Sequence, residues 1–362
     1  MVKGYTAGAA DWREQLRVNS RRTVWVIIIF ILLYVCVGLL VDLFIHYTGY
    51  THAFSTSGSY NYYTSPPTLG QVFINLVTFH TIPWATLVML VIALFSLLIT
   101  YSMYNKLMLL GTEYVEVTAQ STDWQGKQLY NVIEEMKVAA GMRYMPRVFI
   151  INADYMNAFA SGYSEKSAMV AITRGLMEKL NRSELQAVMA HELSHIRHGD
   201  IKLTLTASVL SNLMLMAMDI LFYGVIFGGG SRRGSEEGNR GANILVLIIF
   251  IVRFILPIVT VLLMLYLSRT REYMADAGCV ELQRDNEPLI HALLKIDQDH
   301  KQNAKQYSRA YHQTAHESVR RESYIYDPIK MGIESPRGPA DWFSTHPSMK
   351  KRLAALGFRI KS

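Results

Sequence analysis

Cysteine and charge are both scarce in this sequence. Only two cysteines, Cys36 and Cys279, occur in 362 residues. Because Cys36 lies inside a long apolar run, a disulfide between the two is implausible, and the chain fits a reducing compartment. Charged residues make up 18% of the chain and hydrophobic residues 51%. The sequence lacks the combined aromatic and basic pattern typical of nucleic-acid binding, so the net charge of +7 is better suited to anionic lipid headgroups.

Long apolar runs account for this composition. There are four of them: residues 23–45, 82–101, 203–227 and 244–267. Each is long enough to cross a bilayer as a helix. The first run is too long for the core of a signal peptide and has no obvious small-residue cleavage site, so we expect it to be retained. The sequence therefore predicts an integral membrane protein with two large polar segments, 102–202 and 268–362.

The distribution of basic residues predicts the orientation of these runs. Four arginines precede the first run: Arg13, Arg17, Arg21 and Arg22. Residues 46–80 contain no lysine, arginine, aspartate or glutamate. By the positive-inside rule, the N-terminus and both polar segments are cytoplasmic, and residues 46–80 form an outer loop. Residues 1–101 then hold the N-terminal tail and two spans, and residues 203–267 form a transmembrane hairpin.

The hairpin has two features of its own. Its loop, residues 228–243, carries three arginines although it would lie outside, so a hairpin that enters the bilayer without crossing it is an open alternative. Each of its spans contains one charged residue, Asp219 in the first and Arg253 in the second. Both lie about 21–24 Å from the cytoplasmic ends at the helical rise per residue. Since an isolated charge in hydrocarbon is costly, the matched depths predict an ion pair.

A short motif in the first polar segment carries most of the chemical information. It reads His191-Glu192-Leu193-Ser194-His195. On a helix the two histidines are one turn apart, so both imidazoles project from one face and can hold one metal ion. The glutamate lies beside them, where its carboxylate can take a proton from a water that the metal activates. The alternative is a helix whose two histidines face solvent without a shared role.

The residues around this motif predict the helix. Apolar residues recur at helical spacing: Leu185, Val188, Met189 and Leu193. Ser183 is the expected N-terminal cap, with Gln186 as its capping-box partner. Gly199 is expected to end the helix.

Two histidines leave a catalytic zinc ion one ligand short, because such sites usually have three protein ligands and one open position. The best candidate for the third is Glu272, in the charged stretch 268–276. If this stretch is helical, Asp276 lies one turn further on the same face, where it can accept a hydrogen bond from the far nitrogen of a ligating histidine. The alternative is an ordinary charged helix start outside a membrane. Two spans separate His195 from Glu272, and a shared ion requires an even number of crossings.

The polar segments predict several more elements. Short strands are expected at residues 147–151, 158–161 and 168–172, and amphipathic helices at 128–140 and 286–297. Segments 102–202 and 268–362 must pack together for the metal site to close, so we expect one mainly helical domain with a small sheet.

Four motifs, found in order along the chain, resemble those of the HtpX-type membrane zinc metalloproteases, in the larger family that includes the CAAX prenyl proteases. The motifs are Asn157-Ala158-Phe159-Ala160-Ser161-Gly162, residues 184–200, residues 268–276, and Ser344-Thr345-His346-Pro347-Ser348. The resemblance implies a mainly α membrane protein, with four transmembrane helices and a cytoplasmic gluzincin-like α+β zinc-protease domain that contains a small sheet.

The resemblance implies a metal site with one Zn²⁺ per chain. Its ligands would be His191, His195 and Glu272, with Asp276 supporting a ligand from behind. Glu192 would act as general base.

The resemblance also implies a substrate site. An edge strand that pairs with the substrate backbone would comprise Asn157, Ala158, Phe159 and Ala160. His346 and Arg352 would lie at the substrate and stabilise the developing oxyanion. From the residues alone, Asn157 could equally be a turn residue and His346 a surface histidine. Residues 297–343 are polar and depart from a minimal member of the family; they are a candidate lid or regulatory insertion, and by covering the cleft they would make the resting protein self-inhibited.

The activity that the resemblance implies is endoproteolysis in membrane-protein quality control. Substrates would be misfolded or damaged membrane proteins and unfolded polypeptides, cleaved under stress at the cell inner membrane. Other membrane quality-control proteases would be candidate partners. One alternative is a specific processing peptidase of the CAAX type. Another is a non-catalytic zinc-binding scaffold, against which Glu192 argues, because a structural site has no use for a general base and prefers four closed ligands.

Overall fold

The computed structural model describes residues 12–57, 67–109, 112–227, 236–313, 324–326 and 346–358. The chain divides into two compact units. The first comprises Met1–Trp25, Ile99–Leu205 and Met264–Ser362, and the second comprises Val26–Leu98 and Thr206–Leu263.

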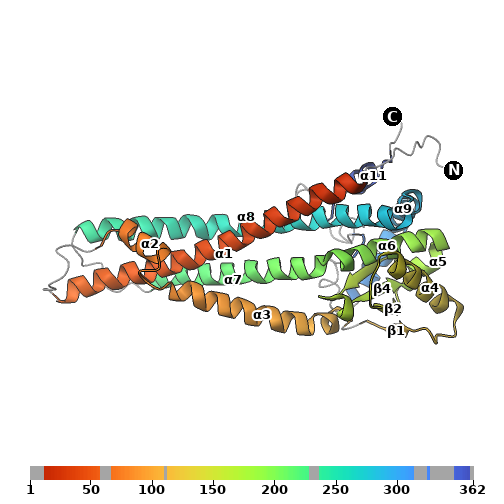
Figure 1. Cartoon of the computed structure of the whole chain (residues 1–362), viewed down its shortest axis with the longest axis horizontal. Helices are drawn as coiled ribbons and strands as arrows, with labels where there is room; N and C mark the ends of the chain where they lie inside the picture. Colours follow the sequence, from red (N-terminus) through yellow and green to blue (C-terminus); the bar gives the residue numbers. More distant parts are fainter. Residues whose placement is uncertain are drawn as a thin grey trace. The chain divides into compact units, whose positions relative to one another are not determined.

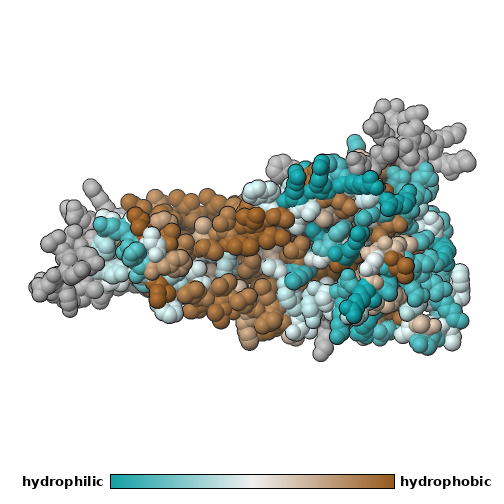
Figure 2. Space-filling view, in the orientation of Figure 1, coloured by the Kyte–Doolittle hydropathy of each residue, from teal (hydrophilic) through white to brown (hydrophobic). Residues whose placement is uncertain are grey.

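The described residues of the second unit are mainly helical (Figure 1). Its segments belong to α1 (Trp12–Ser57), α2 (Leu69–Val77), α3 (Trp84–Leu109), α7 (Asp200–Phe227) and α8 (Glu236–Gln283). Four of these helices, all but α2, are long and apolar enough to cross a membrane. Figure 2 shows hydrophobic side chains gathered over them. The predicted four-span, mainly α membrane protein is therefore confirmed, although every helix extends beyond its apolar run.

Polar contacts join helices within this unit. The predicted pair is present, with Arg253 Nε 2.5 Å from Asp219 Oδ1. Asp42 of α1 is buried and accepts hydrogen bonds from the backbone N–H groups of Ala85 and Thr86 at 2.8 and 2.9 Å. These N–H groups belong to the first turn of α3, where no intrahelical acceptor exists. The carboxylate therefore satisfies donors that hydrocarbon would leave unpaired.

The first unit contains a four-stranded sheet. Its strands are β1 (Tyr114–Val117), β2 (Arg147–Ile151), β3 (Ala158–Ser161) and β4 (Met169–Thr173), in the order β1-β2-β4-β3. β2 and β4 are parallel, and the other pairs are antiparallel. Three of these strands correspond to predicted ones. β1 was not predicted, because three of its four residues are exposed and it lacks the apolar alternation that marks a half-buried strand.

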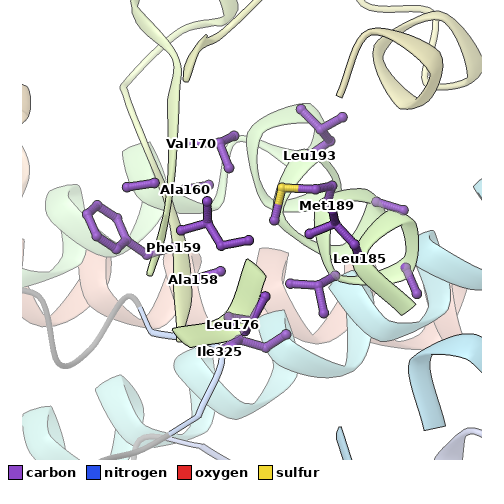
Figure 3. Close-up of a cluster of buried hydrophobic side chains, with 14 of the residues drawn as sticks. Ala158, Phe159, Ala160, Val170, Leu176, Leu185, Met189, Leu193 and Ile325 are labelled. Carbon is purple, nitrogen blue, oxygen red and sulfur yellow. The ribbon is translucent and has the colours of Figure 1, made fainter. Parts of the chain in front are cut away.

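Helices surround this sheet in the first unit. They are α4 (Trp124–Ala139), α5 (Arg174–Lys179), α6 (Arg182–His198), α9 (Glu287–Gln313) and α11 (Met349–Ala355), with a 3₁₀ turn at Glu165–Ser167. α6 packs against α4, α9 and β3. One hydrophobic cluster fills the space between them and includes Ala158, Phe159, Leu185, Met189 and Leu193 (Figure 3). The helix that bears the metal motif is thus held on several sides.

The cap of α6 differs from the prediction. The N-cap is Asn181 rather than Ser183, and its side chain accepts a hydrogen bond from Glu184 N at 2.9 Å. The Glu184 carboxylate in turn accepts from Asn181 N at 2.9 Å. The helix therefore begins two residues earlier than predicted. An asparagine at the N-cap and a glutamate three residues later form the same reciprocal pair of hydrogen bonds that was expected from Ser183 and Gln186. Gly199 ends the helix as predicted, at a φ of +67° that favours glycine.

Parts of several predicted regions lie outside the described residues. They are residues 1–11 of the N-terminal tail, 58–66 of the outer loop, 228–235 of the hairpin loop, 314–323 and 327–343 of the polar stretch, and 344–345 of the fourth motif. The beginning of the polar stretch continues α9 to Gln313.

Candidate metal centre

Three potential metal ligands converge in the first unit. His191 and His195 project from one face of α6, and Glu272 comes from α8. The two Nε2 atoms lie 3.2 Å apart, Glu272 Oε2 lies 3.8 Å from His191 Nε2, and Glu272 Oε1 lies 3.5 Å from His195 Nε2. One ligand atom from each of the three residues can be chosen so that all lie within 4.8 Å of one another. The three side chains are therefore close enough to hold one metal ion.

Hydrogen-bond chemistry also favours a cation here. His191 Nδ1 lies 3.1 Å from Asp276 Oδ1, the contact predicted from the sequence, and His195 Nδ1 lies 2.7 Å from Asp200 Oδ2. Since a carboxylate only accepts, each Nδ1 donates, and in a neutral ring the Nε2 atom then presents a lone pair. Burial and the neighbouring His191 lower the pKa of His195 to about 3, which keeps its ring neutral. The two Nε2 atoms and the Glu272 carboxylate face one another, an arrangement that a metal ion satisfies.

Asp200 is a site residue that the sequence analysis missed. It follows the glycine that ends α6, and it forms an ion pair with buried Arg271. The spacing could have indicated this contact, because a carboxylate five residues after His195 can reach its imidazole ring once Gly199 turns the chain. Asp200 was not singled out because it lies just before an apolar run, where a polar residue is expected at the end of a membrane span.

We expect Asp200→Asn to weaken zinc binding by about 10- to 100-fold, because outer partners of ligating histidines have effects of this size. The amide no longer favours the Nδ1–H form of His195 that turns its Nε2 lone pair to the metal. Competition with a zinc-sensitive dye measures the affinity. Glu281→Gln is the matched control, since Glu281 of α8 pairs with Arg197 of α6, 2.8 Å away, without touching the ligands. An unchanged affinity in Asp200→Asn would exclude this role.

Glu192 is buried beside the ligands. Burial raises the pKa of its carboxyl well above the usual range, and the nearby Glu272 carboxylate raises it further, whereas Arg352 and the backbone amide of Ala160 act in the opposite direction. A carboxylate made more basic in this way is suited to accepting and returning a proton. Its contact with Ala160 places it next to the predicted substrate strand.

His346 and Arg352 also lie at the ligands. His346 Nδ1 is 3.4 Å from Glu272 Oε2, and both side chains are buried. The guanidinium of Arg352 is 3.2 Å from Glu272 Oε2 and donates to Asp276 Oδ1 and Oδ2 at 2.6 and 2.9 Å. Burial alone would lower the pKa of Arg352, but Asp276 and Glu272 raise it above its ordinary value, so the positive charge is permanent.

The predicted substrate strand is β3 at the edge of the sheet. Thr173 N donates to Asn157 O at 2.9 Å, so alternation along an antiparallel pair turns the backbone groups of Phe159 toward β4 as well. The backbone groups of Ala158 and Ala160 then face away from β4. β3 therefore has an outer side with main-chain donors and acceptors, next to Glu192.

The chain is similar to several known proteins. The sequence model of peptidase family M48 matches residues 123–360. A "Protease HtpX homolog" of Helicobacter pylori is 39% identical over 293 residues, 81% of this chain and 86% of that protein. A protein of the same name from Bacteroides fragilis is 31% identical over 307 residues, 84% of this chain and 86% of that protein. The crystal structure of S. mikatae Ste24p aligns with 87% of this chain and 67% of that chain, at 20% identity and a TM-score of 0.45.

Proposed function

The chain belongs to peptidase family M48 and is a membrane metalloprotease, and we propose that its metal is a single zinc ion held by His191, His195 and Glu272. Two imidazoles and one carboxylate with a fourth position left open form a ligand set of catalytic zinc sites. The single observation that carries the proposal is the convergence of three potential ligand atoms beside the buried carboxylate of Glu192.

We propose that different residues of this chain have different roles in peptide hydrolysis. When bound, zinc polarises the scissile carbonyl and makes water acidic enough to react near neutral pH. Glu192 accepts the proton of that water and returns it to the leaving amine. No covalent bond to the protein is needed. Asp276 and Asp200 hold the two histidine rings in the tautomer that exposes Nε2.

In this proposal the substrate backbone lies along β3. Ala158 and Ala160 pair with it through main-chain groups, Asn157 contributes its amide, and Phe159 anchors the strand in the core. Arg352 supplies positive charge, and both Arg352 and His346 supply hydrogen-bond donors, where negative charge develops on the carbonyl oxygen. Main-chain recognition favours unfolded segments over folded ones, since only an extended chain can present its N–H and C=O groups to an edge strand.

We propose that the substrates are misfolded or damaged membrane proteins and other unfolded polypeptides, which makes the protein a quality-control protease active under stress. The arginines before α1 and the uncharged stretch 46–80 support a cytoplasmic N-terminus and a cytoplasmic catalytic domain at the cell inner membrane. Other membrane quality-control proteases are the partners that this role suggests.

Metal removal tests the proposed activity. We expect a zinc chelator to abolish casein cleavage by detergent-purified protein, and stoichiometric Zn²⁺ to restore it. Mg²⁺ should not restore it, because it prefers six oxygen ligands and keeps its waters. Cleavage measured by release of labelled peptides gives the readout. Full cleavage by metal-free protein would contradict the proposal.

A further inference from the structure

Three residues from the C-terminal half of the chain lie on the outer side of β3. Tyr324, Ile325 and Tyr326 are all buried, with Ile325 only 2% exposed. Ile325 N donates to Ala158 O at 3.0 Å. This carbonyl is one of the groups that β3 turns away from β4. The segment therefore lies where the proposed function places a peptide substrate.

The contacts continue along the backbone of this segment. Arg352 Nη1 donates to Ile325 O at 2.8 Å. The Asn157 amide bonds both main-chain groups of Tyr326, since Nδ2 donates to its carbonyl at 3.2 Å and Oδ1 accepts from its N–H at 3.4 Å. Four main-chain groups of two successive residues are thus held by residues of the proposed substrate site. Such bonds do not depend on side-chain identity, as expected of a site that binds many peptides.

The side chain of Ile325 is buried in the hydrophobic core. Its side chain belongs to the same buried cluster as Leu176 and Ala158 (Figure 3). Removing an aliphatic side chain of this size from water makes a large favourable contribution to the free energy of binding the segment. Ile325 is therefore the apolar anchor of the segment.

The two tyrosines contact different aromatic side chains. The ring of Tyr324 packs edge-on against Phe159, with centroids 5.7 Å apart, and its hydroxyl lies 3.2 Å from that of Tyr155. The ring of Tyr326 lies against His300 of α9, with centroids 4.7 Å apart, and its hydroxyl donates to Asp297 at 2.6 Å. Each phenol thus has both an aromatic face and a polar partner.

We infer that Tyr324-Ile325-Tyr326 is a substrate mimic built into the chain, which occupies the peptide-binding edge until a protein substrate displaces it. The inference rests on the proposed function, because it takes β3, Asn157 and Arg352 as the substrate site. It also predicts which peptide side chains the site prefers. We expect the edge of β3 to bind an aliphatic residue between two aromatic residues, and Asp297 and His300 to bind a phenol at the position of Tyr326.

A binding experiment tests this inference without catalysis. The protein is zinc-loaded full-length chain carrying Glu192→Gln, and the probe is the fluorescein-labelled peptide Ser-Tyr-Ile-Tyr-Asp, which copies residues 323–327. We expect Ile325→Asp in this background to bind the probe at least about tenfold more tightly, because the internal competitor loses its anchor. Fluorescence anisotropy gives the affinity, and a probe with aspartate in place of isoleucine should not bind.

A milder pair of variants covers the case in which Ile325→Asp does not fold. Tyr326→Phe removes only the hydroxyl that donates to Asp297. We expect it to bind the probe about threefold more tightly, in line with the loss of one hydrogen bond. Tyr130→Phe on α4 makes the same chemical change away from the segment and should leave binding unchanged.

The outcomes separate this inference from the proposed function. Tighter probe binding, together with faster casein cleavage when Glu192 is intact, supports both. Tighter binding without any cleavage supports the substrate mimic and contradicts the proposed protease chemistry. If folded Ile325→Asp, or Tyr326→Phe where the former does not fold, binds the probe no better than Tyr130→Phe, the segment is a permanent part of the fold and the inference is wrong.

Discussion

Replacing Glu192 with glutamine should lower the rate of casein cleavage by about 100- to 10,000-fold, the range expected when a general base is removed. Glutamine has nearly the same size and keeps the buried position filled, but it cannot accept a proton at neutral pH. Because Glu192 is not among the three converging ligand atoms, the variant should still hold one zinc per chain. Cleavage rate and metal content are measured on the same preparation.

The matched control for this variant is Glu184→Gln. Glu184 lies on the same helix and is also buried, but its carboxylate belongs to the capping box and contacts Lys295 at 2.7 Å. It should lose stability without losing a comparable share of activity per folded molecule. A Glu192→Gln protein that holds zinc and cleaves at the wild-type rate would exclude Glu192 as the base.

Removing the third ligand should have a different effect. We expect Glu272→Ala to lose both zinc and activity, because the carboxylate is the only negatively charged member of the ligand set. Its loss also leaves the Arg352 guanidinium, 3.2 Å from Glu272 in the intact site, without one of its two carboxylate partners. Positive charge beside a site with only two neutral ligands opposes metal binding.

Metal content after dialysis against a weak chelator measures this effect. We expect less than about a tenth of the wild-type zinc in Glu272→Ala, in keeping with the loss of one ligand from three. Glu281→Ala is the control, since Glu281 lies further along α8 and pairs with exposed Arg197. Full zinc in Glu272→Ala would mean that another residue completes the site. A metal ion shared by His195 and Glu272 could then no longer be used to infer an even number of membrane crossings between them.

Local patterns explain which parts of the site could be predicted. The spacing of His191 and His195 follows from helical geometry alone, and the apolar spans follow from their length. Glu272 and Asp276 were found because the motif required a third ligand and helical spacing relates the two carboxylates. The placement of His346 and Arg352 came from family resemblance, since neither belongs to a local pattern that specifies a metal site.

The remaining parts of the site depend on contacts between distant segments. Asp200 reaches His195 only because Gly199 adopts a left-handed conformation, and its pairing with Arg271 brings α7 and α8 together. Tyr324–Tyr326 reaches β3 across more than 160 residues of sequence, as the bond between Ile325 N and Ala158 O shows. Sequence periodicity carries no information about such pairings, so the polar stretch could be predicted only as a candidate lid.

The most direct test of the central claim is the zinc content and casein cleavage of three proteins purified in parallel: wild type, Glu192→Gln and Glu272→Ala. We expect one zinc per chain in the first two proteins, cleavage by wild type alone, and neither zinc nor cleavage in Glu272→Ala. Cleavage by Glu192→Gln at the wild-type rate would contradict the role of Glu192 as general base, and a full complement of zinc in Glu272→Ala would contradict the role of Glu272 as ligand.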